Sequence, residues 1–251
     1  MTTGSPIRLS VVVPLYNETQ TLPELVRRLG AVLDGVEGET EVVLVDDGSV
    51  DRTAELASEA VDRDPRFRLI RLSRNFGHQI AISAGLDAVV GDAVVIMDGD
   101  LQDPPEVIPD LVQRWREGFE IVHAVRVSRE GEPRLRKARA ALFYRLLRRL
   151  TDTDIPADVG DFRLVDRRAL TAFRTMRERN RYIRGMFSWV GFRQTTVGYA
   201  REARYAGESK YPLRKLAKLG ADGVLSFSNA PLRLALRLGF AISTLAFLFA
   251  A

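Results

Sequence analysis

The stretch VVIMDGDLQDPPE, residues 94–106, changes character halfway along its length. An apolar, β-branched run gives way to Asp98, Asp100 and Asp103 with Gln102 among them, and two prolines follow. Such a pattern is typical of a buried strand that ends in a polar loop. The concentration of carboxylates at one strand end predicts a site that uses negative charge.

The same alternation occurs three times before this stretch. The expected strands IRLSVVVPLY (7–16), TEVVLVDDGS (40–49) and FRLIRLS (67–73) precede helical spacing at 21–33, 51–61 and 77–89, and another helix is expected at 105–117. Thr21 and Glu24 predict a capping box at the first helix. Four strand-helix units predict an α/β fold of Rossmann-like character, with a mostly parallel sheet and helices on both faces.

Ligands bind outside the carboxyl ends of the strands in such sheets. Here those ends read PLYNE, VDDGS, SRNFGH and DGDLQD. Neither a G-x-G-x-x-G after the first strand nor a P-loop occurs, and Asp103 and Pro109 stand where a calcium loop needs glycine and glutamate. A non-catalytic nucleotide-binding or signalling module remains a distant alternative, because VLVDD superficially resembles a receiver domain.

Composition indicates one main globular domain, with 46% hydrophobic and 28% charged residues in 251. The chain contains no cysteine, which excludes disulfides and thiolate chemistry, and its N-terminus lacks a signal-peptide pattern. Residues 1–120 carry 11 basic and 22 acidic residues, and the remainder carries 26 and 11. This asymmetry predicts an acidic part that holds a cation and a basic part that faces an anion, although solvated helix faces would explain many of the arginines.

Asp98 and Asp100 are two residues apart, so in an extended chain both carboxylates point to the same side. We expect them to share Mg²⁺ or Mn²⁺ with the phosphates of a nucleotide. The alternative is an acid-rich turn without a metal, because Asp and Gly are common in turns. The position at the end of the fourth expected strand favours the metal site.

The motifs VVVPLYNE, VVLVDDGSVDRT, LSRNFGHQ, MDGDLQDPPE, GDFRL and GESKY, in this order, resemble the inverting glycosyltransferases of family two, which have the A-type fold. Within that family they are similar to the polyprenyl-phosphate sugar transferases related to dolichol-phosphate mannose synthase. The resemblance implies a nucleotide-sugar site formed by Pro14, Tyr16, Asn17, Glu18, Asp46, Asp47, Ser73, Asn75, His78 and Asp98, with metal ligands Asp98, Asp100 and Gln102. For His78, a hydrogen bond that stabilises the loop is an equal alternative.

The family acceptor is a lipid phosphate, which is largely anionic near neutral pH and needs positioning more than deprotonation. We expect the acceptor phosphate to be bound by Arg126, Arg139, Arg204, Ser209 and Lys210. The resemblance assigns catalytic roles to Asp100, Arg126 and Asp161. Asp161 could act as a base, or it could instead orient an arginine or the sugar.

The C-terminal residues 238–251, LGFAISTLAFLFAA, are uncharged, and they are shorter than the ~20 residues that span a bilayer. We therefore expect a glycosyltransferase domain at 1–210, an amphipathic juxtamembrane segment at 211–237, and from 238 the start of a transmembrane helix that continues beyond residue 251. This arrangement predicts an enzyme at the inner (cytoplasmic) membrane whose catalytic domain faces the cytosol.

The resemblance implies metal-dependent, inverting transfer of a sugar from a nucleotide-sugar to a polyprenyl phosphate. A UDP-sugar is favoured as donor, and GDP-mannose remains open, as does the identity of the sugar. The nearer rival is a family-two enzyme acting on a glycan or protein; the Q-x-x-R-W motif of processive synthases does not follow MFSWVGFR. The expected partners are the donor, the acceptor and membrane lipid, without nucleic acid, and a homo-oligomer is left open.

Overall fold

The structure is a computed structural model that describes residues 8–127, 159–176, 178, 181–200 and 230–250. The chain divides into two compact units, one of Met1–Glu130 with Asp158–Glu208 and one of Gly131–Ala157 with Ser209–Ala251. The first unit contains the sheet and the candidate site. In the second, the described part is one helix.

The first unit is built on one sheet of seven strands in the order β3-β2-β1-β4-β6-β5-β7. β6 runs antiparallel to β4 and β5, and the other described strands are mutually parallel. The strands are β1 Arg8–Leu15, β2 Glu39–Asp46, β3 Phe67–Arg71, β4 Ala93–Ile96, β5 Ile121–Arg126, β6 Val159–Asp166 and β7 Gln194–Tyr199. The predicted α/β fold with a mostly parallel sheet is confirmed.

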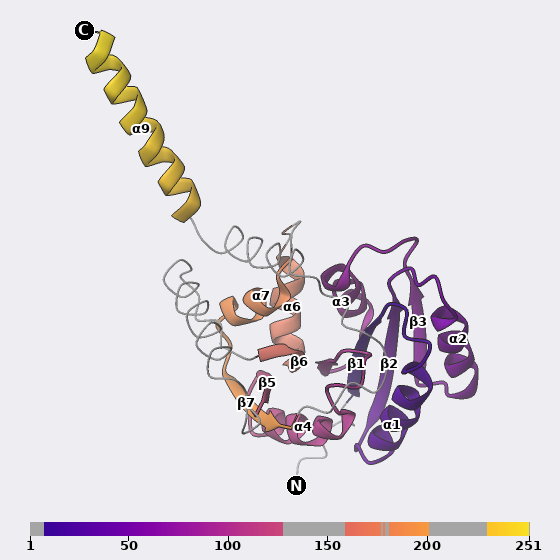
Figure 1. Cartoon of the computed structure of the whole chain (residues 1–251). Helices are drawn as coiled ribbons and strands as arrows, with labels where there is room; N and C mark the ends of the chain where they lie inside the picture. The colour runs from indigo at the N-terminus through magenta and orange to yellow at the C-terminus, as the bar shows by residue number, and fades with distance from the viewer. Residues whose placement is uncertain (1–7, 128–158, 177, 179–180, 201–229, 251) are drawn as a thin grey trace. The chain divides into compact units, whose positions relative to one another are not determined.

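Helices cover both faces of this sheet (Figure 1). They are α1 Leu22–Asp34, α2 Thr53–Arg63, α3 His78–Ala88, the 3₁₀ turn η1 Pro105–Val107, α4 Ile108–Arg116, α6 Arg167–Thr175 and α7 Ile183–Trp189. The helices α1, α2 and α4 lie on one face, and α3, α6 and α7 lie on the other.

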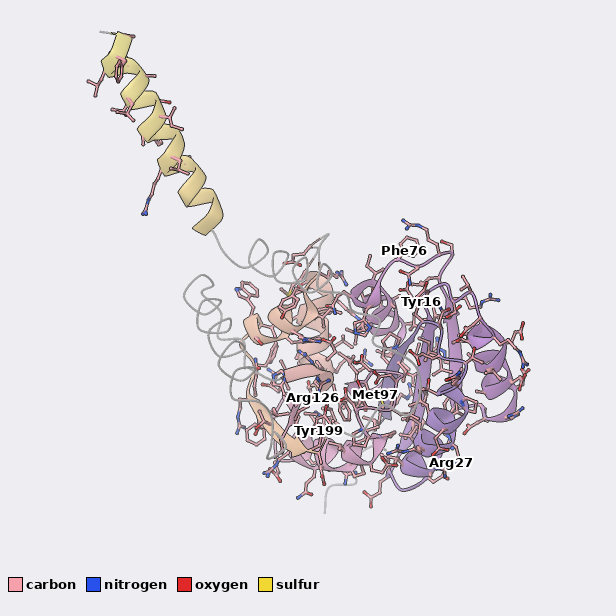
Figure 2. The ribbon with its side chains drawn as sticks, in the orientation of Figure 1. Tyr16, Arg27, Phe76, Met97, Arg126 and Tyr199 are labelled. Carbon is pink, nitrogen blue, oxygen red and sulfur yellow. The ribbon has the colours of Figure 1, made fainter. Side chains whose placement is uncertain are left out.

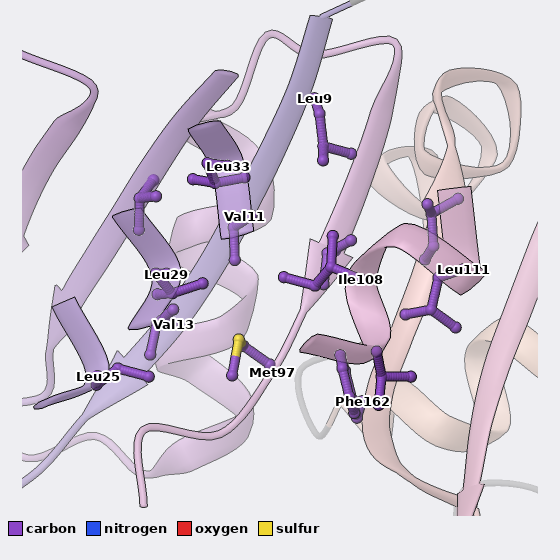
Figure 3. Close-up of a cluster of buried hydrophobic side chains, with 14 of the residues drawn as sticks. Leu9, Val11, Val13, Leu25, Leu29, Leu33, Met97, Ile108, Leu111 and Phe162 are labelled. Carbon is purple, nitrogen blue, oxygen red and sulfur yellow. The ribbon is translucent and has the colours of Figure 1, made fainter. Parts of the chain in front are cut away.

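The core on the α1 face follows from helical and strand periodicity together. Leu25, Leu29 and Leu33 repeat at helical spacing along α1 and are fully buried. They pack over Val11 and Val13, alternate residues of β1 that point to the same face, as Figure 3 shows. Burial of each leucine stabilises the fold by about 2 kcal/mol.

The opposite face depends on a close approach of α3 to the sheet. A Cβ atom placed on Gly85 would lie 2.3 Å from Val12 Cγ1 and 3.1 Å from Val45 Cγ2. No side chain fits in that space, so glycine lets the helix backbone approach β1 and β2. This contact sets the position of α3, whose first residue is His78.

The predicted capping box at α1 is wrong. Thr21 is the N-cap residue, but its side chain makes no capping hydrogen bond. Its hydroxyl donates instead to Glu18 Oε2 at 2.8 Å, and Glu24 binds Arg27 at 2.6–2.7 Å. The Thr21 side chain is thus bonded to the Glu18 carboxylate, and the Glu24 side chain forms an ion pair with Arg27 within the helix, so neither is available for a capping box.

The described part of the second unit is the helix α9, Ala230–Ala250. Its side chains at residues 236–250 are exposed. Across the part of the chain that the structure describes, no helix combines the length and apolar character needed to cross a membrane.

Candidate active site

The antiparallel strand β6 brings a new residue to the carboxyl edge of the sheet. Parallel strands β1, β2 and β4 end at this edge, and β6, which runs the other way, begins there. Asp161, near the start of β6, therefore lies beside the loop that follows β4. His78 reaches the same place from the start of α3.

Four charged side chains form a cluster at this edge. His78 Nε2 lies 3.1 Å from Asp161 Oδ2 and 3.4 Å from Asp98 Oδ1. Arg184, from α7, donates to both oxygens of Asp161, with Nε 2.8 Å from Oδ1 and Nη2 3.0 Å from Oδ2. Asp161 is 1% exposed, so its carboxylate depends on such side-chain partners, and the fully buried Arg163 also lies near it, with Nη2 3.8 Å from Oδ1.

The cluster shifts the pKa values of its members. Burial lowers the pKa of His78, but Asp98 and Asp161 outweigh burial and raise this pKa to about 9. Burial raises the pKa of Asp98 to about 6, against the attraction of His78. For Asp161, burial acts upward, yet Arg184 and His78 hold the pKa well below its usual range. Asp161 is therefore an ionised carboxylate of low basicity at neutral pH.

The same cluster has the donor set of a divalent metal site. Ligand atoms of His78, Asp98 and Asp161 lie within 4.8 Å of one another. Asp98 Oδ1 is buried and forms no hydrogen bond with the described residues. Two carboxylates together with a neutral imidazole can ligate a divalent ion, so these residues could hold one once His78 has lost its proton.

Of the three predicted metal ligands, Asp98 belongs to this group. Asp100 Oδ1 accepts the backbone N–H of Gln102 at 3.1 Å, and the intervening Leu101 is buried in a left-handed conformation with φ of 58°. Asp100 and Gln102 thus form a tight turn next to the cluster. Their metal role stays a prediction.

The predicted nucleoside residues lie at the ends of β1 and β2. Asn17 has φ of 55°, and its side chain accepts the Val50 N–H at 3.0 Å, while Glu18 N–H donates to Thr53. Pro14 is buried within β1, and Tyr16 directly after the strand is 37% exposed. Tyr16 thus brings an aromatic ring to the surface at this edge, and its binding of a nucleoside stays a prediction.

The loops after β2 and β3 are joined by the side chain of Asp47, which binds backbone N–H groups of the second loop. Asp47 accepts the N–H groups of Phe76 and Gly77 at 2.8 and 2.9 Å, and Asp46 accepts that of Ser49. A Cβ atom on Gly48 would lie 2.4 Å from the carbonyl carbon of Arg74, so only glycine permits this contact. Asp46 and Asp47 therefore shape the loops, and direct binding of a nucleoside by them stays a prediction.

The structure describes only some of the remaining predicted residues. Ser73 and Asn75 are exposed in the loop after β3. Arg126, the last residue of β5, is half-buried and hydrogen-bonded to Tyr199. Arg139, Arg204, Ser209 and Lys210 lie outside the described residues.

Sequence reasoning did not predict Arg184 or Tyr199. Both occur in ordinary contexts, RYIRGM and TVGYA, where neither spacing nor strand pattern distinguishes them. The one available signal for Arg184 is the buried acid opposite it, since a carboxylate in GDFRL at a strand start requires a cation from elsewhere.

The α/β sheet with an acidic cluster at its carboxyl edge is an architecture found in glycosyltransferases, and the relatives of the chain belong to that class. Residues 10–173 match the model of glycosyl transferase family 2, so the chain belongs to this family and is a glycosyltransferase. It is 49% identical over 243 residues to an uncharacterized glycosyltransferase of Bacillus subtilis (strain 168), covering 97% of this chain and 75% of that protein.

Other relatives have more specific names. The chain is 37% identical over 245 residues to the prophage bactoprenol glucosyl transferase homolog of Escherichia coli (strain K12) and to the bactoprenol glucosyl transferase of Shigella phage SfV, covering 98% of this chain and 80% of each relative. The resemblance to family-two enzymes of the polyprenyl-phosphate type is thereby confirmed.

A solved structure supports the fold. Glucosyl-3-phosphoglycerate synthase from Mycobacterium tuberculosis, in complex with Mn²⁺, uridine diphosphate and glucosyl-3-phosphoglycerate, superposes with a TM-score of 0.60 at 21% identity, covering 86% of this chain and 76% of that one. At this identity the likeness shows a shared A-type architecture.

Proposed function

We propose that the protein transfers a sugar, with inversion, from a UDP-sugar to a polyprenyl phosphate at the cytoplasmic face of the membrane. The observation that carries this proposal is the 37% identity to bactoprenol glucosyl transferases over 98% of the chain. The charged cluster of His78, Asp98, Asp161 and Arg184 is suited to this reaction, because it combines possible metal ligands with an arginine. Because these relatives are named glucosyl transferases, UDP-glucose is the first donor to test.

The donor side of the reaction needs stabilisation of a developing diphosphate anion. The sugar–phosphate bond breaks as an acceptor oxygen attacks the anomeric carbon, and the electron pair leaves on the nucleoside diphosphate. A divalent ion held by Asp98 and its neighbours would supply electrostatic stabilisation of that leaving group. Among the described residues, Arg184 adds positive charge at the same cluster.

The acceptor side does not require a general base. A phosphate monoester has a second pKa of about 6, so it is already anionic at neutral pH. The low pKa of Asp161 makes this carboxylate a poor base, whereas its bonds to His78 and Arg184 suit it to hold those cations in place. We therefore assign Asp161 a positioning role.

A membrane location follows from the acceptor's chemistry, because a polyprenyl chain partitions into lipid. The uncharged stretch at residues 238–250 of α9 is consistent with contact with the bilayer, and Arg233 and Arg237 immediately precede it. We propose that the catalytic unit works on the cytosolic side. Recovery of the protein in the membrane fraction, and its release by detergent but not by high salt, would support this location.

The direct test is sugar transfer from labelled UDP- and GDP-sugars to a short polyprenyl phosphate in detergent with Mg²⁺ or Mn²⁺. We expect label from one UDP-sugar to move into the organic phase and to stay in water when EDTA is added. Transfer to a glycan or peptide acceptor, with none to the lipid, would contradict the acceptor assignment. A nucleotide that binds without any transfer would support the alternative of a binding module.

A further inference from the structure

Arg126 is held by two side chains whose roles the proposed function leaves open. Arg126 Nε donates to the Tyr199 hydroxyl at 3.2 Å, and Nη2 lies 3.4 Å from Asp103 Oδ1. Tyr199 in turn donates its hydroxyl proton to the same Asp103 oxygen. The three groups form a directed chain, from guanidinium to phenol to carboxylate. Figure 2 shows Arg126 and Tyr199 beside each other, on β5 and β7.

The two partners are far more buried than the arginine they hold. Asp103 is 0% and Tyr199 5% exposed, whereas the Arg126 side chain is 30% exposed. The Tyr199 ring also packs edge-on against Phe162 at 5.7 Å. Asp103 and Tyr199 are therefore held in the interior, and the Arg126 guanidinium is the cationic end of the network that reaches solvent.

The space around Arg126 is shaped as well. A Cβ atom on Gly160 would lie 3.2 Å from Arg126 Nη2 and 3.7 Å from Cζ, so the guanidinium lies across the bare backbone of β6. Gly160 directly precedes Asp161 of the charged cluster. Arg126 is thus adjacent to the carboxyl edge that carries Asp161. Burial lowers the pKa of Arg126, but Asp103, Tyr199 and, to a smaller extent, Asp98 raise it.

We propose that Tyr199 and Asp103 are positioning residues that aim the Arg126 guanidinium at the phosphate of the acceptor, in the space that Gly160 leaves. The proposal rests on the proposed function, because it takes the acceptor to be a phosphate. A guanidinium is a rigid fork, so the orientation of its Nε and Nη2 edge determines where its remaining N–H groups point. Without the network, the flexible side chain would have to be ordered upon each binding event.

The decisive variant is Tyr199→Phe, which removes the hydroxyl and keeps the ring. We expect the KM for polyprenyl phosphate to rise about fivefold to tenfold, the effect of one misdirected charge-assisted hydrogen bond, while the KM for the UDP-sugar changes less than about twofold. Gly160→Ala, which presses on Arg126 without touching its partners, should raise the same KM.

The matched control is Ser10→Ala, which also removes one buried hydroxyl. Ser10 lies near the start of β1, at the opposite end of the sheet, where it bonds Glu41 and Gly91. A merely structural role for Tyr199 predicts that both variants lose active enzyme without a change in either KM. That result, or an equal rise of both KM values in Tyr199→Phe, would overturn the proposal.

A second measurement separates this proposal from the proposed function. In ¹⁵N-arginine-labelled full-length protein, the Arg126 Nε–H should exchange slowly with solvent, and Tyr199→Phe should accelerate that exchange about tenfold or more. Unchanged exchange would show that Tyr199 does not hold Arg126. If the unaltered chain transfers no sugar to lipid phosphate, the proposed function fails, and the exchange rates still decide whether Tyr199 holds Arg126.

Discussion

Arg184 on α7 binds Asp161 on β6 through two hydrogen bonds, from Nε to Oδ1 at 2.8 Å and from Nη2 to Oδ2 at 3.0 Å. This pair holds the helix α7 against the carboxyl edge of the sheet. It also commits both carboxylate oxygens, which bears directly on what Asp161 can do in catalysis.

We expect Asp161→Asn to lower the free energy of unfolding by about 2–3 kcal/mol, because it leaves Arg184 without its anionic partner. The Asp161→Asn and Arg184→Gln variants should lose transfer activity to a similar extent, because both substitutions break the same ion pair. Chemical denaturation and initial rates measure the two effects. Abolished turnover in Asp161→Asn with unchanged Mn²⁺-dependent UDP binding, beside near-normal turnover in Arg184→Gln, would restore the role of a base.

The pKa values of the two histidines of the chain should be shifted in opposite directions. Burial and the nearby Arg163 lower the pKa of His123 to about 4, whereas that of His78 is raised to about 9. A proton NMR titration of the imidazole signals should therefore show one transition on each side of pH 6.5. Two transitions near pH 6.5 would contradict both environments.

The same shifts predict how stability depends on pH. Between pH 6.5 and 4 the unfolded chain protonates His123 before the folded chain does, so the free energy of unfolding falls as the pH falls. Between pH 6.5 and 9 the folded chain keeps the proton on His78, so stability falls as the pH rises. Asp98, with its pKa raised to about 6, opposes the first slope, and His123→Gln should remove that slope.

Removal of one carboxylate should uncouple nucleotide binding from the metal. We expect Asp98→Asn to weaken Mn²⁺-dependent UDP binding about tenfold or more, because it leaves a neutral amide where the ion needs an anionic ligand. Calorimetry with and without EDTA measures the effect. Asp87→Asn, at an exposed acid on α3, is the matched control, and an equal loss in both variants would refute a local metal site.

Two helical glycines should respond oppositely to alanine. Gly85→Ala forces a Cβ atom to within 2.3 Å of Val12, so we expect it to destabilise the fold by about 1–3 kcal/mol and to displace α3 with His78. Gly30→Ala on α1 meets only Arg66 Nη2 at 3.8 Å, and should stabilise by up to about 1 kcal/mol. Thermal unfolding of the two variants would compare them, and equal effects would contradict the close packing of α3.

The polar loops that follow strands β1 to β4 could be predicted, because they depend on local signals in the sequence. Apolar runs that end in polar loops gave β1 to β4, and parallel strands bring such ends together by geometry alone. The reversal of β6 could not be predicted, because GDFRLVD has the same apolar character in either direction. The sequence therefore offered Asp161 as a base or as an orienting group without indicating its neighbours, and the structure places it with His78 and Asp98.

The partners of the site acids were less predictable than the acids themselves. A carboxylate at a strand end is visible in the sequence, but the cation that satisfies it comes from wherever the tertiary fold brings one. Arg184 lies 23 residues from Asp161, and Tyr199 lies 96 residues from Asp103. Side-chain pairs at such separations leave no periodic trace in a single sequence.

The reversal of β6 also has an evolutionary consequence. The chain leaves β5 after Arg126 and enters β6 at Val159 on the same edge of the sheet, because these neighbouring strands are antiparallel. A connection that departs from and returns to one edge can be lengthened, shortened or exchanged without changing the register of any strand. Residues 127–158 can thus change in evolution while the strand ends that carry Asp98 and Asp161 stay in place.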